Sequence, residues 1–179
     1  MKYLLAHKLY AILALALLIR LAVLLAFPSV FAFDQTGAIH GSQTYDVYAR
    51  NLLATGVYGR VAGVPDGLLP PLYSYVLAGV YGLLGRGYLQ VGLFHITLDL
   101  LTITLVYHLG RRLLPRGEAA SALAALFYAL YPYLIFQNLT LIDTPLFMVL
   151  LYAFLLALAL LRQRRSFDRT AWALAVLSG

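Results

Sequence analysis

The sequence predicts an all-α fold: a bundle of transmembrane helices that crosses the bilayer several times, with an outer-face loop containing juxtamembrane helices. The first observation is composition, because 63% of the 179 residues are hydrophobic, 11% are charged, and the mean hydropathy is +0.85. Soluble domains are closer to half apolar and a quarter charged, so lipid must solvate much of this surface. The second and third observations are long apolar runs and short clusters of cations between them.

The composition also excludes several functions. The formal net charge is +6, which would suggest nucleic acid in a soluble protein, but most of the cations flank apolar runs and serve topology instead. No nucleic-acid partner is therefore expected. The chain contains no cysteine, which excludes disulfides, a thiolate nucleophile and a zinc site with cysteine ligands.

Four apolar runs are predicted to span the membrane, at 9–27, 88–110, 119–136 and 144–161. A signal peptide is the alternative for the first, but that run is long enough to span and no small-x-small cleavage site follows. A partial span at 170–179 is too short to cross, so the chain is interpreted as the N-terminal part of a larger protein. A short protein with a frayed end is the alternative.

An outer loop is predicted at 33–87, with juxtamembrane helices at about 42–54 and 71–85. In the first, tyrosine and leucine side chains fall at helical spacing and Gly56 ends the pattern. The second begins at Pro70-Pro71 and contains too few apolar residues for a hydrocarbon core of about 30 Å.

Charge counting favours this topology. If the second loop helix does not span, nine of the 13 cations lie on the cytoplasmic side with the N-terminus. Only Arg50, Arg60 and Arg86 lie outside, and Arg20 lies in the membrane. A full span at 72–84 would place both arginine clusters outside. The chain is therefore predicted to be a multi-pass protein of the plasma (inner) membrane with its loop on the outer face.

Three ionisable groups are candidates for chemistry. Asp143 lies between two spans, where a carboxylate can reach water, a metal or a basic substrate; a helix N-cap is the alternative, because Thr144-Pro145 follows. Asp99 lies inside a span one turn after His95, which suggests an ion path or a polar contact between helices. Arg20 can snorkel to the interface or meet a lipid phosphate.

The motifs, taken in order, resemble a known family. The loop holds GSQTYDVYARNLLATGVYG, then PPLYSYVLAGVYGLLGRG; YHLGRRLLPRGEAASALAALFYALYPYLI and NLTLIDTPLF follow. Together they resemble the N-terminal part of the GT-C superfamily of polyprenyl-phosphate-sugar-dependent glycosyltransferases. The nearest types are families 39 and 83, the protein O-mannosyltransferases and the lipid A aminoarabinose transferases.

The resemblance implies transfer of a sugar from a polyprenyl-phosphate-linked donor to an acceptor, a protein, lipid or glycan, on the outer face. The first loop of the family carries the pattern D-[ES]-x-x-Y-x-x-x-A-x-x-L, which matches here except that Gly41 replaces the acidic residue. Asp46 or His40 is the predicted substitute. Asp143 matches the second acidic site, and we expect it to be catalytic.

The resemblance also implies substrate-binding residues. Tyr45, Pro71 and Tyr73 lie in the matching motifs, and Arg20, Arg50 or Arg86 would supply the cation that holds the leaving phosphate. A divalent metal ion at Asp143 is left open. Two alternatives remain: a non-catalytic or degenerate homologue, which Gly41 favours, and a transporter or channel subunit that uses Asp99 and His95.

Overall fold

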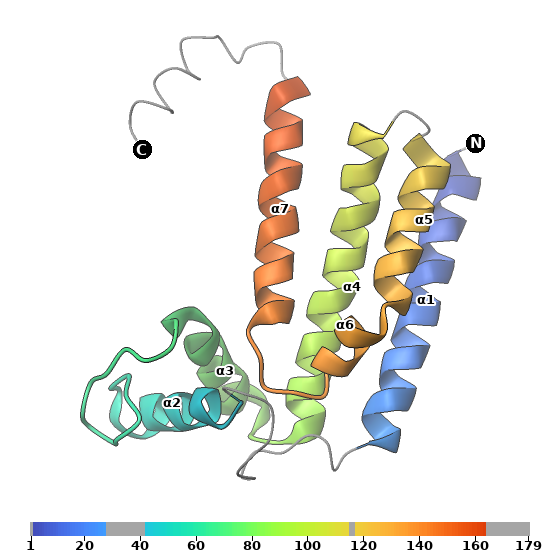
Figure 1. The fold of residues 1–179 in the computed structure, drawn as a ribbon. Helices are drawn as coiled ribbons and strands as arrows, with labels where there is room; N and C mark the ends of the chain where they lie inside the picture. The colour runs from blue at the N-terminus through green and yellow to red at the C-terminus, as the bar shows by residue number, and fades with distance from the viewer. Residues whose placement is uncertain (1, 28–41, 115–116, 164–179) are drawn as a thin grey trace, which may run out of the picture.

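The computed structural model describes residues 2–27, 42–114 and 117–163, and these form a helical structure (Figure 1). The helices are α1 (Lys2–Ala26), α2 (Ser42–Thr55), α3 (Pro71–Leu84), α4 (Tyr88–Leu113), α5 (Gly117–Leu130), α6 (Pro132–Gln137) and α7 (Thr144–Gln163). The only β pairing among the described residues is one isolated bridge, in the loop after α2. The predicted all-α class is confirmed. The predicted partial span at 170–179 lies outside the described residues.

Helices α1, α4, α5 and α7 lie side by side, and α4 packs against each of the other three (Figure 1). Three segments are long and apolar enough to cross a membrane: His7–Ala26, Tyr88–Leu113 and Thr144–Arg162. Large apolar side chains remain exposed on them, such as Phe147 and Phe154 on α7. An exposed apolar surface of this kind is covered by lipid, so the chain is a multi-pass membrane protein.

The apolar run at 119–136, predicted as one span, is divided into α5 and α6. Tyr131 separates them in an extended conformation, with φ −68° and ψ 115°. Proline at position 132 lacks an amide hydrogen and disfavours the helical conformation of the residue before it. The short α6 leaves the axis of α5 (Figure 1), and the segment after it, 138–143, runs back to the start of α7.

Helices α2 and α3 lie at one end of the bundle, beside the ends of α1, α4 and α7 (Figure 1). Helix α2 ends at Gly56, which has a positive φ of 72° and donates its amide to Leu52 O at 2.9 Å, a glycine C-terminus. Helix α3 begins with Pro71 at its first position, where the missing amide hydrogen costs nothing. At 14 residues each, neither can cross a hydrocarbon core alone.

The loop between α2 and α3 is held by a stack of three tyrosine rings. Tyr58 stacks on Tyr48 of α2 at 4.1 Å and on Tyr75 of α3 at 5.8 Å between ring centroids. The Tyr58 hydroxyl donates to Leu69 O at 2.8 Å, and Asp66 accepts from the Tyr48 hydroxyl. The loop is therefore fixed to both helices.

The opposite end of the bundle carries cations. Lys8 near the start of α1 pairs with Glu118 of α5 at 3.1 Å, and Arg111, Arg112 and Arg162 lie in the last turns of α4 and α7. The structure thus separates these cations from α2 and α3 by the length of the bundle.

Candidate functional site

Asp143 lies in a cleft between the N-terminal ends of α3 and α7. The cleft has a volume of about 140 Å³ and is lined by Pro70, Leu72, Tyr73, Asp143, Leu146, Phe147 and Leu150. The Asp143 carbonyl accepts from the Phe147 amide at 2.9 Å, so the residue holds the N-cap position of α7. Asp143 is also partly exposed, so the residue that caps α7 remains accessible to a ligand.

Two predicted substrate-binding tyrosines adjoin this carboxylate. Tyr45 of α2 and Tyr73 of α3 are both buried, and their rings pack edge to face with centroids 4.8 Å apart. Burial, and then the negative charge of the adjacent Asp143, raise the pKa of Tyr45. Burial, with the neighbouring Tyr45 and Asp143, raises the pKa of Tyr73 well above its ordinary value. Both phenols therefore remain protonated donors at neutral pH.

Asp46, the residue after Tyr45 in α2, anchors a second cluster. The Asp46 side chain is buried, with 1% of its surface exposed, and its carboxylate accepts from the Tyr81 hydroxyl at 2.8 Å. Arg86 donates to it from Nε at 2.8 Å and from Nη2 at 3.1 Å, and Arg50 donates from Nε at 2.9 Å. One carboxylate thus orients two guanidinium groups whose side chains are 50% (Arg50) and 32% (Arg86) exposed.

The catalytic role of Asp46 stays a prediction, and the geometry favours another one. A general base needs a free lone pair that the substrate can reach, whereas this carboxylate is buried and both of its oxygens accept bonds from basic side chains. With two arginines and one aspartate, the cluster has a formal charge of +1. That charge, on side chains that are partly exposed, suits an anion such as a phosphate.

Arg20 and Asp99 form an ion pair inside the bundle. Arg20 Nε donates to Asp99 Oδ2 at 2.9 Å, and their side chains are 0% and 2% exposed. Arg20 also donates to Ala129 O at 2.9 Å, and Asn138 Nδ2 donates to the same Asp99 oxygen at 2.8 Å. Arg20 therefore does not snorkel: the nearby carboxylate holds the guanidinium in the core, away from the cleft. The substrate contact predicted for Arg20 stays untested, although this geometry favours a link between helices.

His95 lies one turn before Asp99 on the same face of α4 and contacts Tyr73 of α3. Its Nε2 lies 2.8 Å from the Tyr73 hydroxyl, and the ring is fully buried. Because Asp99 is paired with Arg20 and His95 with Tyr73, the two residues form polar contacts between helices. This is the alternative to an ion path that the sequence left open.

The other predicted residues are placed as follows. Pro71 is exposed at the first position of α3, and its neighbour Pro70 lines the cleft. His40 and Gly41 lie outside the described residues. Within those residues, no group of three histidine, aspartate or glutamate side chains is arranged to hold a metal, so the metal at Asp143 stays a prediction.

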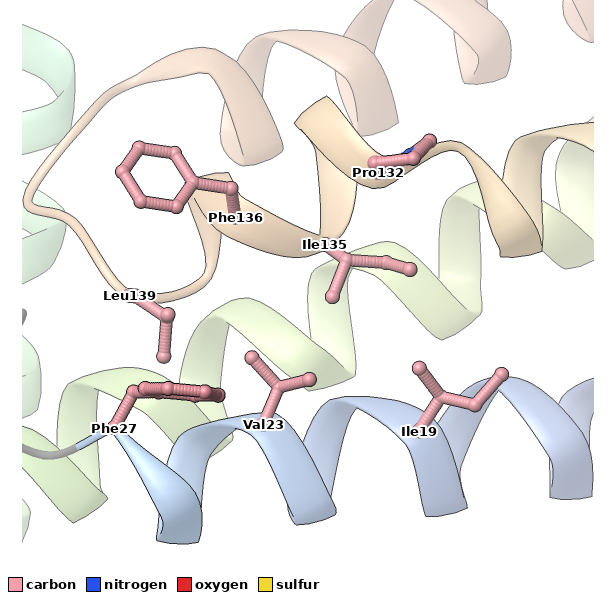
Figure 2. Close-up of a pocket in the computed structure, with 7 residues that line it drawn as sticks. All are labelled: Ile19, Val23, Phe27, Pro132, Ile135, Phe136 and Leu139. Atoms are coloured by element: carbon pink, nitrogen blue, oxygen red, sulfur yellow. The ribbon is translucent and has the colours of Figure 1, made fainter.

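A second and larger pocket lies between α1 and α6. Figure 2 shows its apolar lining, with Ile19, Val23 and Phe27 facing Ile135, Phe136, Leu139 and Pro132. Its volume is about 440 Å³, but none of the lining side chains is ionisable. It offers space to a hydrocarbon chain and no reactive group.

Sequence reasoning did not identify Tyr81 or Asn138 as functional partners. Tyr81 could have been found, because it follows Tyr73 by eight residues and Leu77 by four on one buried face of α3. The partnership of Asn138 with Asp99 joins residues 39 positions apart, and no local pattern predicts it.

The fold defines a class, the multi-pass, all-helical membrane proteins, and in this chain Asp143 lines a largely apolar cleft at the start of one of the long helices. The chain belongs to the dolichyl-phosphate-mannose-protein mannosyltransferase family, whose model matches residues 69–178. This family comprises membrane glycosyltransferases that use a polyprenyl-phosphate sugar donor. The match includes α3, Asp143 and α7, whereas α1 and α2 precede it. No curated protein and no solved structure matches the chain.

Proposed function

We propose that this chain contributes the cleft in which a sugar is transferred from a polyprenyl-phosphate donor to an acceptor hydroxyl at the outer membrane face. The observation that carries the proposal is the position of Asp143. Asp143 lines the cleft at the N-terminal end of α7, and Leu146, Phe147 and Leu150 of that helix line it further along. A lipid-linked sugar has the same division, with a hydrocarbon tail and a polar head.

Asp143 is proposed as the general base. The acceptor oxygen attacks the anomeric carbon of the sugar, the bond from that carbon to the phosphate oxygen breaks, and Asp143 takes the acceptor proton. A positioned base of this kind contributes roughly 10²–10⁴-fold to a rate. The protonated hydroxyls of Tyr45 and Tyr73, beside the carboxylate, would orient it and the sugar.

Arg50 and Arg86 are proposed to hold the leaving phosphate. The departing polyprenyl phosphate gains negative charge as the sugar is released, and fixed cations stabilise that charge without reorganising. The Asp46 carboxylate holds both guanidinium groups in place, because it accepts hydrogen bonds of 2.8–3.1 Å from them. This is a positioning role for the carboxylate that the sequence suggested as catalytic.

The proposal also includes the orientation of the chain in the membrane. We place α2 and α3 on the outer face because nine cations then lie at the other, cytoplasmic side with the N-terminus. The described residues supply Asp143 but no group of three metal-binding side chains, so no step is assigned to a metal ion.

The test is sugar transfer by membranes that contain the full-length gene product. With radiolabelled polyprenyl-phosphate mannose as donor, Asp143→Asn is expected to lower the rate by at least ~10²-fold, because the amide cannot accept the proton. Glu118→Gln, a matched loss of one carboxylate at the opposite bundle end, is the control and should keep the parental rate. Near-parental transfer by Asp143→Asn would refute the role, and no transfer by the parent would favour the degenerate homologue.

A further inference from the structure

Helices α3 and α7 form the two walls of the Asp143 cleft, yet they have little direct contact with each other. Each packs instead against α4. Helix α4 therefore connects the two walls, in addition to Tyr45 of α2, which packs on Tyr73 and adjoins Asp143. The hydrogen bonds from α4 to residues near the cleft depend on direction and distance, so they can fix the separation between α3 and α7.

One face of α4 contacts both walls. His95 bonds through Nε2 to the hydroxyl of Tyr73, a cleft residue on α3, at 2.8 Å. Asp99 lies one turn further along the same face and accepts from Asn138 Nδ2 at 2.8 Å. Asn138 begins the segment that leads to Asp143 at the start of α7.

The segment that carries Asp143 is fixed at that point. Asn138 is 1% exposed, and Leu139 and Leu141 are buried in the same core as Tyr73. Arg20 and Tyr128 also bond to Asp99, so the carboxylate that holds Asn138 is itself held from two other helices. Because Asn138 precedes Asp143 by only five residues, displacing Asn138 would also shift Asp143.

We infer that His95 and Asp99 are positioning residues, which hold Tyr73 and the Asn138–Asp143 segment at a fixed separation and so set the geometry of the cleft. The placement stands on the contacts alone. Its consequence for sugar transfer rests on the proposed function, because a misplacement of about 1 Å at a reacting group lowers a rate on the order of 10²-fold.

The test measures the cleft directly as well as the activity. The 179 residues contain no cysteine. In a full-length background from which any further cysteine is removed, Leu83→Cys on α3 and Phe154→Cys on α7 can carry nitroxide labels, because both side chains are exposed and lie outside the cleft lining. Asn138→Ala and His95→Phe each remove one tie without leaving a charge unpaired. His95→Gln keeps a group that can bond to the Tyr73 hydroxyl, and Thr97→Ala removes an exposed hydroxyl from the same helix as the matched control.

The labelled full-length protein should show a shifted or broader interspin distance in Asn138→Ala and His95→Phe, and the parental distance in His95→Gln and Thr97→Ala. The kcat for transfer should fall roughly 10- to 100-fold in the first two, with little change in KM for the donor, whose tail contacts remain. If either tie-removing variant fails to fold, the other decides. Parental distances in the variants that fold would overturn the inference. Altered distances with no transfer by the parent would support it and reject the proposed function instead.

Discussion

The buried Arg20–Asp99 pair allows stability and activity to be separated. The perturbations are Arg20→Met, Asp99→Leu and the two combined. The pair is 2.9 Å long with side chains 0% and 2% exposed, so each single change leaves the other charge without its partner in a low-dielectric interior. Breaking a buried pair in this way costs about 3–5 kcal/mol, whereas replacing both partners by apolar residues is often neutral.

The double variant should therefore be within about 1 kcal/mol of the parent, because Asn138 keeps its bond to Leu134 O at 2.9 Å. The coupling between the two sites, measured as the departure from additivity, should be several kcal/mol. The assay is unfolding in mixed detergent micelles, followed by circular dichroism. A double variant as unstable as the sum of the singles would refute the reasoning. Even if the double variant is as stable as the parent, it should transfer sugar more slowly than the parent, because Asn138 has lost its acceptor on α4.

Two further changes test the loop side of the site. Asp46→Asn should leave Arg86 and Arg50 less well oriented and lower kcat/KM about tenfold, or ~1.4 kcal/mol, mainly through kcat, because the two cations stabilise charge that develops as the phosphate leaves. An unchanged kcat/KM would argue against phosphate binding there, and Asp66→Asn, on the neighbouring loop, is the comparison for loop damage. The pKa of Tyr45 is raised by burial and by Asp143, so the folded state binds the phenol proton more tightly than the unfolded state. The protonated phenol therefore contributes to the free energy of unfolding below pH about 10, and this contribution is lost as the pH rises further. Tyr45→Phe should therefore reduce the pH dependence of the free energy of unfolding above that pH, measured by circular dichroism for the parent and the variant in parallel.

Much of the helical architecture follows from local sequence. Composition and apolar runs predict the long helices, and Gly56 and Pro71 mark where α2 ends and α3 begins because their backbone preferences act locally. The division at Tyr131 was missed, although Pro132 was visible. Hydropathy averages over a window and does not register the loss of one amide donor, so the proline should have been weighed separately.

The site was predictable only in part. Asp143, Tyr45 and Tyr73 were each singled out by their motifs, and the structure brings them together. The partners of the other charges could not be deduced, because Asp46 meets Arg86 across 40 residues and Asp99 meets Arg20 across 79. Such contacts depend on how the helices cross, which a single sequence does not specify. The catalytic role of Asp46 stays a prediction, and the structure adds its hydrogen bonds from Arg50 and Arg86.

The stacked rings of Tyr48, Tyr58 and Tyr75 have a consequence for recognition. Fixing a flexible residue into one conformation costs about 1–2 kcal/mol in backbone entropy, and a loop that orders only on contact with a ligand must meet that cost from its binding energy. Here the loop between α2 and α3 is already held to both helices by the stack. A molecule that approaches this end of the bundle meets a surface whose shape was decided during folding, so its affinity reflects the contacts it makes and carries little penalty for organising the protein.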